Sequence, residues 1–127
     1  KVTGVQTSAL PIYLLLIISC KEEEENFKCN VTFKGKSYHS NEVICIGSAD
    51  RLSQTVRDDW AIDIVYVEGV PNSNFIRIQT DISSPIYDGY GASIERSGNE
   101  LTFNGTLNYG SNNTGNISGS CSCTKGP

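Results

Sequence analysis

The sequence predicts an all-β fold: a single small β-sandwich or barrel of about seven to nine antiparallel strands, with at most one short helix. Apolar residues recur mostly with a period of two, which is the period of a half-buried strand. Turn residues interrupt this alternation about every eight to twelve positions. The chain also holds 12 glycines, as the tight turns of a hairpin-rich fold require.

The clearest strand is expected at the start of the domain, where Phe27, Cys29, Val31 and Phe33 alternate with polar residues. Lys34-Gly35-Lys36 then supplies a hairpin turn. Further strands are expected over 37–39, 42–46, 60–67, 75–79, 92–95, 101–107 and 117–123. The strand over 60–67 places Trp60 in the core, and Ser97-Gly98-Asn99-Glu100 forms the turn before 101–107.

One segment is expected to be helical. Ser48 is a favourable N-cap for residues 49–56, and Leu52 and Val56 lie four positions apart, as on one face of a helix of one or two turns. Pro85 places the segment 82–88 at a sheet edge or in a loop, because proline cannot donate to a central ladder.

Chain length and net charge indicate the number of domains and argue against nucleic acid as a partner. The chain has 127 residues, enough for one domain, which we place at residues 27–127. Its net charge is −4, and the sequence contains no basic cluster. We therefore expect no nucleic-acid binding.

The first twelve residues are set aside from the fold. Residues 2–12 read V-T-G-V-Q-T-S-A-L-P-I, which resembles a translated short-read sequencing adapter and departs from it only at Ser8. The resemblance implies that 1–12 is an assembly artefact fused to a truncated gene. Fused segments of this kind do not contribute to a fold.

The next residues predict export and lipid attachment. The apolar run in 13–19 ends in Ser19 and is followed by Cys20, which fits the end of a truncated signal peptide. Ile17-Ile18-Ser19-Cys20 resembles the lipobox of bacterial lipoproteins, in which the cysteine carries the lipid. The resemblance implies that Cys20 is the point of membrane attachment. Residues 20–26, with the acidic run Glu22–Glu25, would then form a solvated tether.

Two further resemblances concern location. Cys-Lys-Glu-Glu at the start of the tether is similar to the surface-export signal of Bacteroidota lipoproteins. Phe33-Lys34-Gly35-Lys36 and the closing Ser118-Gly119-Ser120-Cys121-Ser122-Cys123 resemble the small lipoproteins of that group that have no assigned function. These likenesses imply an outer-membrane lipoprotein displayed at the cell surface. They transfer no catalytic residue.

The remaining cysteines are Cys29, Cys45, Cys121 and Cys123. An even number of cysteines in an exported chain favours disulfides over a metal site. Cys121 and Cys123 point the same way from one strand, which makes a bridge between them geometrically poor. Each is therefore expected to pair with Cys29 or Cys45, in either order.

The sequence offers little for catalysis or for a cofactor. His39 is the only histidine, and no nucleophile–base pair is apparent. Asp58, Asp59 and Asp63 fit solvated strand-end charges better than a calcium loop. We therefore expect a non-enzymatic protein without metal or cofactor. Asn-x-Ser/Thr triplets begin at Asn30, Asn104, Asn112 and Asn116, and behind a lipobox they are interpreted as ordinary turn and strand composition.

The favoured function is binding or envelope interaction, with an extracellular glycan or protein as the partner. Tyr87, Tyr90 and Tyr109 fall in or near loops and are candidates for a ligand platform. A glycan-binding accessory protein is the first alternative, and it requires these tyrosines to face solvent. A periplasmic small inhibitor presenting the loop 85–91, or a ligand carrier with an apolar cavity, is the second.

Overall fold

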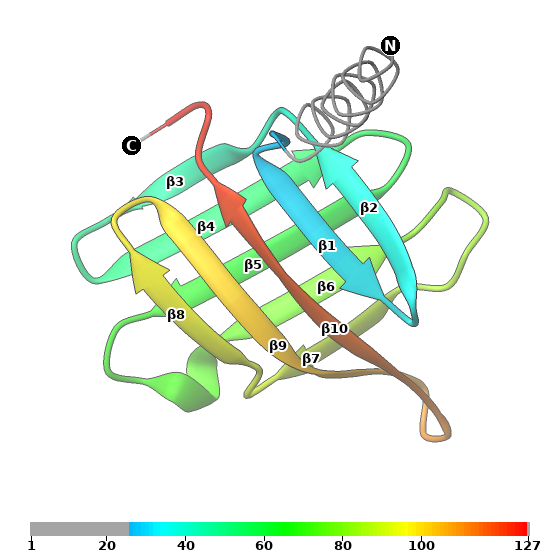
Figure 1. Cartoon of the computed structure of the whole chain (residues 1–127). Helices are drawn as coiled ribbons and strands as arrows, with labels where there is room; N and C mark the ends of the chain where they lie inside the picture. Colours follow the sequence, from blue (N-terminus) through cyan, green and yellow to red (C-terminus); the bar gives the residue numbers. More distant parts are fainter. Residues whose placement is uncertain (1–25, 127) are drawn as a thin grey trace, which may run out of the picture.

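The computed structural model describes residues 26–126, which form an all-β domain of ten antiparallel strands curled into a half-barrel (Figure 1). The strands are β1 (Cys29–Phe33), β2 (Lys36–Ser40), β3 (Ile44–Ser48), β4 (Arg51–Arg57), β5 (Ala61–Val67), β6 (Phe75–Gln79), β7 (Tyr87–Tyr90), β8 (Ser93–Ser97), β9 (Glu100–Tyr109) and β10 (Asn113–Ser122). A single 3-10 turn, η1 (Pro71–Ser73), precedes β6. The predicted all-β class is confirmed.

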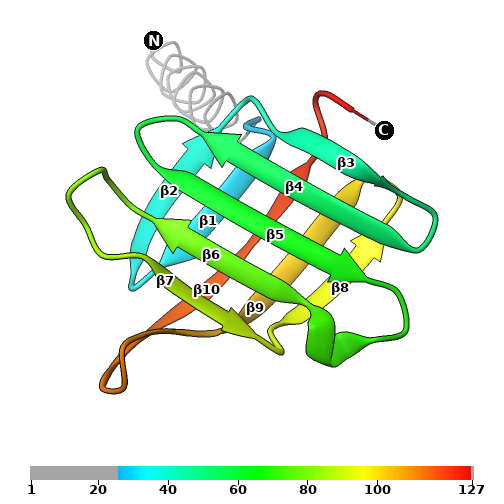
Figure 2. The same ribbon diagram turned by 180° about the vertical axis from the view of Figure 1, so that it is seen from behind.

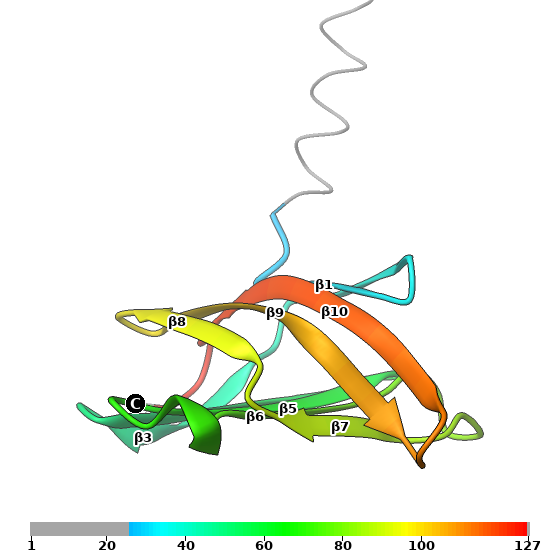
Figure 3. The ribbon, with the colours of Figure 1, turned by 90° about the horizontal axis from the view of Figure 1, so that it is seen from below.

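The strands lie in two layers that belong to one continuous sheet. The strand order is β2-β1-β10-β9-β7-β6-β5-β4-β3, and β8 pairs with the free part of β9. Figure 2 shows β3 to β7 as one layer, and Figure 3 shows β8, β9, β10, β1 and β2 arching over it. The two layers meet where Asp88 of β7 pairs with Asn108 of β9.

The opposite side of the half-barrel is closed by the segment that follows β10. This segment crosses to β3, where Lys125 forms a parallel bridge with Ile44. The Cys45 N–H donates to the Lys125 carbonyl at 2.7 Å, and the Val43 N–H donates to Thr124 Oγ1 at 2.7 Å. The chain therefore joins its two layers at both sides.

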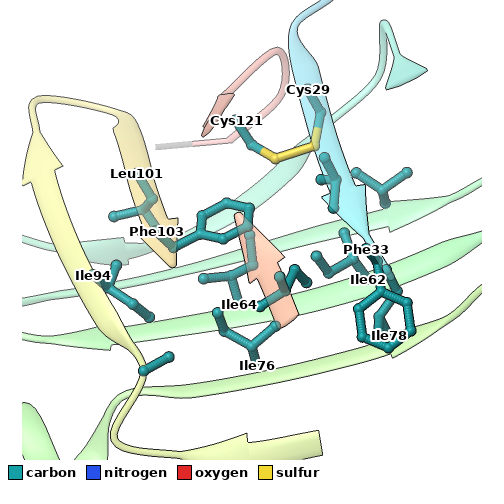
Figure 4. Packing of buried hydrophobic residues seen from close by; sticks show 14 of the residues in the cluster. Cys29, Phe33, Ile62, Ile64, Ile76, Ile78, Ile94, Leu101, Phe103 and Cys121 are labelled. Atoms are coloured by element: carbon teal, nitrogen blue, oxygen red, sulfur yellow. A yellow bond between two sulfur atoms is a disulfide. The ribbon is translucent and has the colours of Figure 1, made fainter. Parts of the chain in front are cut away.

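The core fills the space between the layers (Figure 4). Alternate residues of nearly every strand point inward and are buried, which is why the sequence reads with a period of two. The largest fully buried apolar side chains are Phe103, Leu52, Ile62, Ile64, Ile76, Ile78, Leu101, Leu107, Ile117, Val31 and Val43. Trp60 is buried as expected, and its indole N–H donates to the His39 carbonyl at 3.0 Å.

Two disulfides form, as predicted, and the structure selects one of the two orders left open. Cys29 and Cys121 face each other across the β1–β10 ladder and are bonded. Cys45 of β3 is bonded to Cys123, which follows β10. The first bond reinforces neighbouring strands, whereas the second ties the two layers together.

The expected helix over 49–56 is wrong, since these residues contribute to β4 and to the turn before it. Leu52 and Val56 lie inward together with Gln54, whereas Arg51 and Arg57 point outward. A spacing of four residues is a multiple of the strand period as well as about one helical turn. That spacing therefore did not discriminate between the two.

The described part of the chain has ten strands, slightly more than the seven to nine predicted. The segment 85–91 does not form a loop that could be presented to a partner as an inhibitor loop would be. Residues 87–90 form β7, which pairs along its length with β6 and at one position with β9. Pro85 lies in the loop before this strand, where a missing N–H costs no ladder bond. The two strands without a predicted counterpart are β4, where a helix was expected, and β7, where an edge or loop was expected.

Gln54 is a polar side chain in the apolar core. It is 1% exposed, and its amide nitrogen donates to the Asn99 carbonyl at 3.1 Å and to the Cys121 carbonyl at 2.9 Å. Its amide oxygen has no hydrogen-bond partner among the described residues. Gln54 thus links β4 of one layer to β10 and to the β8–β9 turn of the other.

The segments predicted for export and anchoring lie outside the described residues. These are the adapter-like 1–12, the signal-peptide remnant 13–19, Cys20 and the acidic run of the tether. Within residues 26–126 there is no helix with the length and apolar character needed to cross a membrane.

Removal of the Cys45–Cys123 bond should lower the free energy of unfolding by about 4 kcal/mol, because it closes a loop of 78 residues in the unfolded chain. The double variant Cys45→Ala/Cys123→Ala should also exchange amide hydrogens faster in β3. Urea unfolding and hydrogen–deuterium exchange measure the two effects. The matched variant Cys29→Ala/Cys121→Ala should leave exchange in β3 unchanged, and equal exchange in both variants would contradict the layer-tying role.

Gln54→Leu should destabilise the domain by about 2 kcal/mol, because the buried Cys121 carbonyl and the Asn99 carbonyl of the β8–β9 turn lose a donor while the side-chain volume is kept. Chemical unfolding monitored by Trp60 fluorescence measures the change. Ser53→Ala, at the neighbouring outward position, is the control and should change stability by less than about 0.5 kcal/mol. An unchanged midpoint for Gln54→Leu would show that the amide does not hold the layers together.

Candidate functional site

An extended surface of small uncharged polar side chains lies on the outside of β9, β10, β1 and β2, bordered by the exposed Glu95 of β8 and Glu100 of β9. Along β9 the outward residues are Thr102, Asn104, Thr106 and Asn108, and every one is exposed. Along β10 they are Thr114, Asn116, Ser118 and Ser120. We call these residues, together with Asn30, Thr32, Ser37 and His39 of β1 and β2, the polar face.

Strand register arranges the polar face in rows that run across the sheet. One row places His39 beside Asn30, Asn30 beside Ser120, and Ser120 beside Thr102. The next row places Ser37 beside Thr32, Thr32 beside Ser118, and Ser118 beside Asn104. Residues directly opposite each other in antiparallel strands lie about 5 Å apart. The face is therefore a regular array of hydroxyl and amide groups.

The polar face is hollowed but open. Two neighbouring depressions of about 500 and 420 Å³ lie along it, and both include Thr32, Asn104 and Ser118 in their lining. Thr106 Oγ1 donates to Asn116 Oδ1 at 3.0 Å within the face. At the edge, His39 Nδ1 lies 2.8 Å from Asn30 Oδ1, and its ring stacks on Phe27 at a centroid distance of 4.9 Å.

The outside of the other layer has a different character. Its outward residues include the ion pairs Arg57–Asp63 at 2.9 Å and Arg77–Asp88 at 3.9 Å. Exposed apolar side chains lie there too, with Ile46 75% and Tyr90 73% exposed. The outside of β3 to β7 thus carries ion pairs and apolar groups, whereas the polar face is made of neutral groups and is bordered by Glu95 of β8 and Glu100 of β9. Neutral polar side chains therefore dominate the outer surface of only one of the two described layers.

The Asn-x-Ser/Thr triplets follow from this arrangement. Asn30 and Thr32 are successive outward residues of one strand, as are Asn104 and Thr106, and Asn116 and Ser118. Where an outward Asn is followed by Ser or Thr at the next outward position, such a triplet results, because successive outward residues are two positions apart. The triplets were noted in the sequence, but the polar face was missed. The same period-two count, applied to polar instead of apolar residues over 102–108 and 114–120, would have found it.

The three candidate platform tyrosines do not form one exposed surface. Tyr87 points into the core and is 7% exposed. Tyr109 packs on Tyr87 with ring centroids 5.8 Å apart. Tyr90 lies at the end of β7 and packs on Phe75, at 4.9 Å. Tyr87 and Tyr90 are separated by an odd number of strand positions, which places them on opposite faces of the sheet.

The other residues considered for chemistry are dispersed. His39 contacts Asn30 and Phe27 at the edge of the polar face. Asp63 lies in the middle of β5, where its carboxylate accepts hydrogen bonds from Arg57 and Thr55. Across residues 26–126, no group of three or more His, Cys, Asp or Glu side chains is placed to hold a metal ion.

Comparison with known proteins adds no family to this description. No protein-family model and no curated protein matches the sequence.

Proposed function

We propose that this protein is a non-enzymatic binding module, held at the bacterial outer membrane by a lipid on Cys20 and displayed at the cell surface. In this proposal the partner is an extracellular glycan, which the module contacts through the polar face and not through the expected platform of Tyr87, Tyr90 and Tyr109, since these do not form one exposed surface. Catalysis, metal and nucleic acid have no part in it.

The observation that carries the proposal is the neutral array of hydroxyl and amide groups across β9, β10, β1 and β2. Hydroxyls and side-chain amides both donate and accept hydrogen bonds, as sugar hydroxyls do. Desolvating neutral groups costs much less than desolvating charges. The array itself contains no Lys, Arg, Asp or Glu and is therefore suited to contact a polar, hydroxyl-rich polymer, with Glu95 and Glu100 at its border.

The open shape of the face supports a polymer as the ligand. The depressions are shallow and continuous along the strands, and they share several lining residues. A chain of sugar residues could lie along such a surface without having to enter a closed cavity. A ligand carrier, in contrast, requires an interior space, and here buried side chains fill the region between the layers.

The anchoring part of the proposal is supported by the lipobox-like Ile17-Ile18-Ser19-Cys20 and by the acidic tether. Two disulfides agree with a location outside the cytoplasm, where such bonds form and persist. In this proposal the tether precedes β1, and Phe27, the first residue after the tether, stacks on His39 at the edge of the polar face.

Glycan binding should be lost when ion pairs replace the neutral array. Asn104 and Ser118 are direct cross-strand partners at the centre of the face. Asn104→Lys/Ser118→Glu should retain stability, because opposite charges pair across strands. It should bind glycans at least tenfold more weakly, a loss of about 1.4 kcal/mol. The full chain carrying Cys20→Ala, screened on an array of plant, animal and bacterial glycans, provides the measurement.

The matched control is Ile46→Glu/Ser53→Lys, which introduces the same charges at a cross-strand pair on the outside of the other layer. This variant should bind as the parent does. The proposal fails if the parent chain binds no glycan on the array, or if both double variants lose binding equally.

Surface display has its own test. The gene, placed behind a complete lipoprotein signal peptide, should yield a domain that added protease removes from intact cells. Cys20→Ala should abolish this cleavage, because without the lipid the domain is not held at the surface. Protection of the lipidated protein until the outer membrane is opened would place the domain in the periplasm and contradict surface display.

A further inference from the structure

A second concave site lies at the end of the half-barrel, between the β1–β2 turn and the β6–β7 loop. Figures 1 and 2 show both loops at the same end of the molecule. The site has a volume of about 290 Å³. We call it the end pocket, and it is lined by Phe33, Lys34, Lys36, Tyr38, Thr80, Ser84, Pro85 and Tyr87.

The charge of the end pocket is positive. Lys34 and Lys36 line it, and no carboxylate is part of its lining. Among the described residues, neither lysine forms an ion pair. Asp81, in the β6–β7 loop, accepts hydrogen bonds from the Ser83 N–H and hydroxyl at 2.8 Å, and the hydrogen bonds from Ser83 and Ser84 lower the pKa of its carboxyl. It lines a different depression.

Lys34 is held in place over the aromatic wall of the pocket. Its ammonium group donates to the Tyr87 hydroxyl at 3.1 Å and lies 4.9 Å from the centroid of the same ring. Its stem crosses β10 at Gly115, where an added Cβ would lie 2.8 Å from Lys34 Cγ and 2.7 Å from the Phe33 ring. The absence of a side chain at Gly115 therefore makes room for Lys34 to reach the pocket.

The backbone of Lys34 adopts a conformation that is unfavourable for lysine. Lys34 and Gly35 form a two-residue hairpin turn with φ angles of 52° and 82°. In such a turn Asn, Asp or Gly is preferred at the first position, because other residues are strained at positive φ. A lysine here weakens the turn and supplies an ammonium group to the pocket.

We propose that the end pocket binds one anionic pyranose unit of the glycan that lies along the polar face. Paired ammonium groups recognise the acid, whether a carboxylate or a sulfate ester. The Tyr38 ring contacts the apolar side of the sugar ring, and the Thr80 and Ser84 hydroxyls contact its hydroxyls. The volume is at the lower limit of small-ligand pockets, which fits one sugar unit and not several.

This inference rests on the proposed glycan-binding function, and the chain connects the two sites directly. Gly35 lines a depression of the polar face, while its neighbours Lys34 and Lys36 line the end pocket. A polymer that follows the polar face toward the β1–β2 turn would therefore present its next unit to the lysines.

Calorimetric titration of the full chain carrying Cys20→Ala tests the end pocket with glucuronate, glucose 6-sulfate and neutral glucose. We expect at least one of the two acids to bind at least tenfold more tightly than glucose, and the stronger of them identifies the acid. Lys34→Asn should weaken binding of that acid at least tenfold. It should not lower the melting temperature, because asparagine tolerates positive φ better than lysine.

Lys28→Asn is the matched control, since it makes the same charge change at an exposed residue before the other end of β1. It should bind the acid as the parent does, and Lys34→Arg should retain most of the affinity. The inference is overturned if neither acid is preferred to glucose, or if Lys34→Asn and Lys28→Asn weaken binding equally. On the glycan array, a second outcome separates the two proposals. If glycans bind the parent and Lys34→Asn equally but do not bind Asn104→Lys/Ser118→Glu, the polar face is supported as the binding surface and only the end pocket is rejected.

Discussion

The closure of the two layers by the residues after β10 is the constraint on which the rest of the domain depends. On one side the layers are a single sheet that bends between β7 and β9. On the other side the crossing segment joins them, through the Cys45–Cys123 bond and the hydrogen bonds of Thr124 and Lys125 to the start of β3. Gln54 adds a buried link from β4 to the carbonyl of Cys121. Without this closure, the inner faces of both layers would be open to water along one edge.

Because the core is closed in this way, the two outer surfaces are free to differ. Alternation along each strand commits inward positions to apolar packing and leaves outward positions unconstrained by the core. One layer uses that freedom for ion pairs and isolated apolar groups, and the other uses it for Ser, Thr and Asn. An array of short side chains on a disulfide-bonded sheet is pre-organised for contact, because short side chains have little conformational entropy to lose on binding. The end pocket adds charge only where the polar face meets the β1–β2 turn.

Most strands could be predicted because their apolar residues alternate, as Phe27 to Phe33 and Leu101 to Leu107 do. The failure over 49–56 has a physical reason: Leu52 and Val56 satisfy both the helical and the strand period, and the segment is too short to decide between them. Of the candidate site, the Asn-x-Ser/Thr pattern was visible but was not connected to a surface. The predicted tyrosine platform is wrong because the sequence near Pro85 does not reveal which residues of the strand face inward. In the structure Tyr87 faces the core and Tyr90 faces solvent.

The sequence by itself determined the all-β class, the positions of the main turns, and a pairing of Cys121 and Cys123 with Cys29 and Cys45. It did so because strand alternation, turn preferences and the geometry of neighbouring cysteines are local properties of the chain. Only the tertiary structure decided that Cys29 bonds Cys121, that the sheet bends between β7 and β9, and that β1, β2, β9 and β10 bring their polar residues to one surface. These outcomes depend on which strands become neighbours, and a period of two identifies the face of a residue but not the strand beside it.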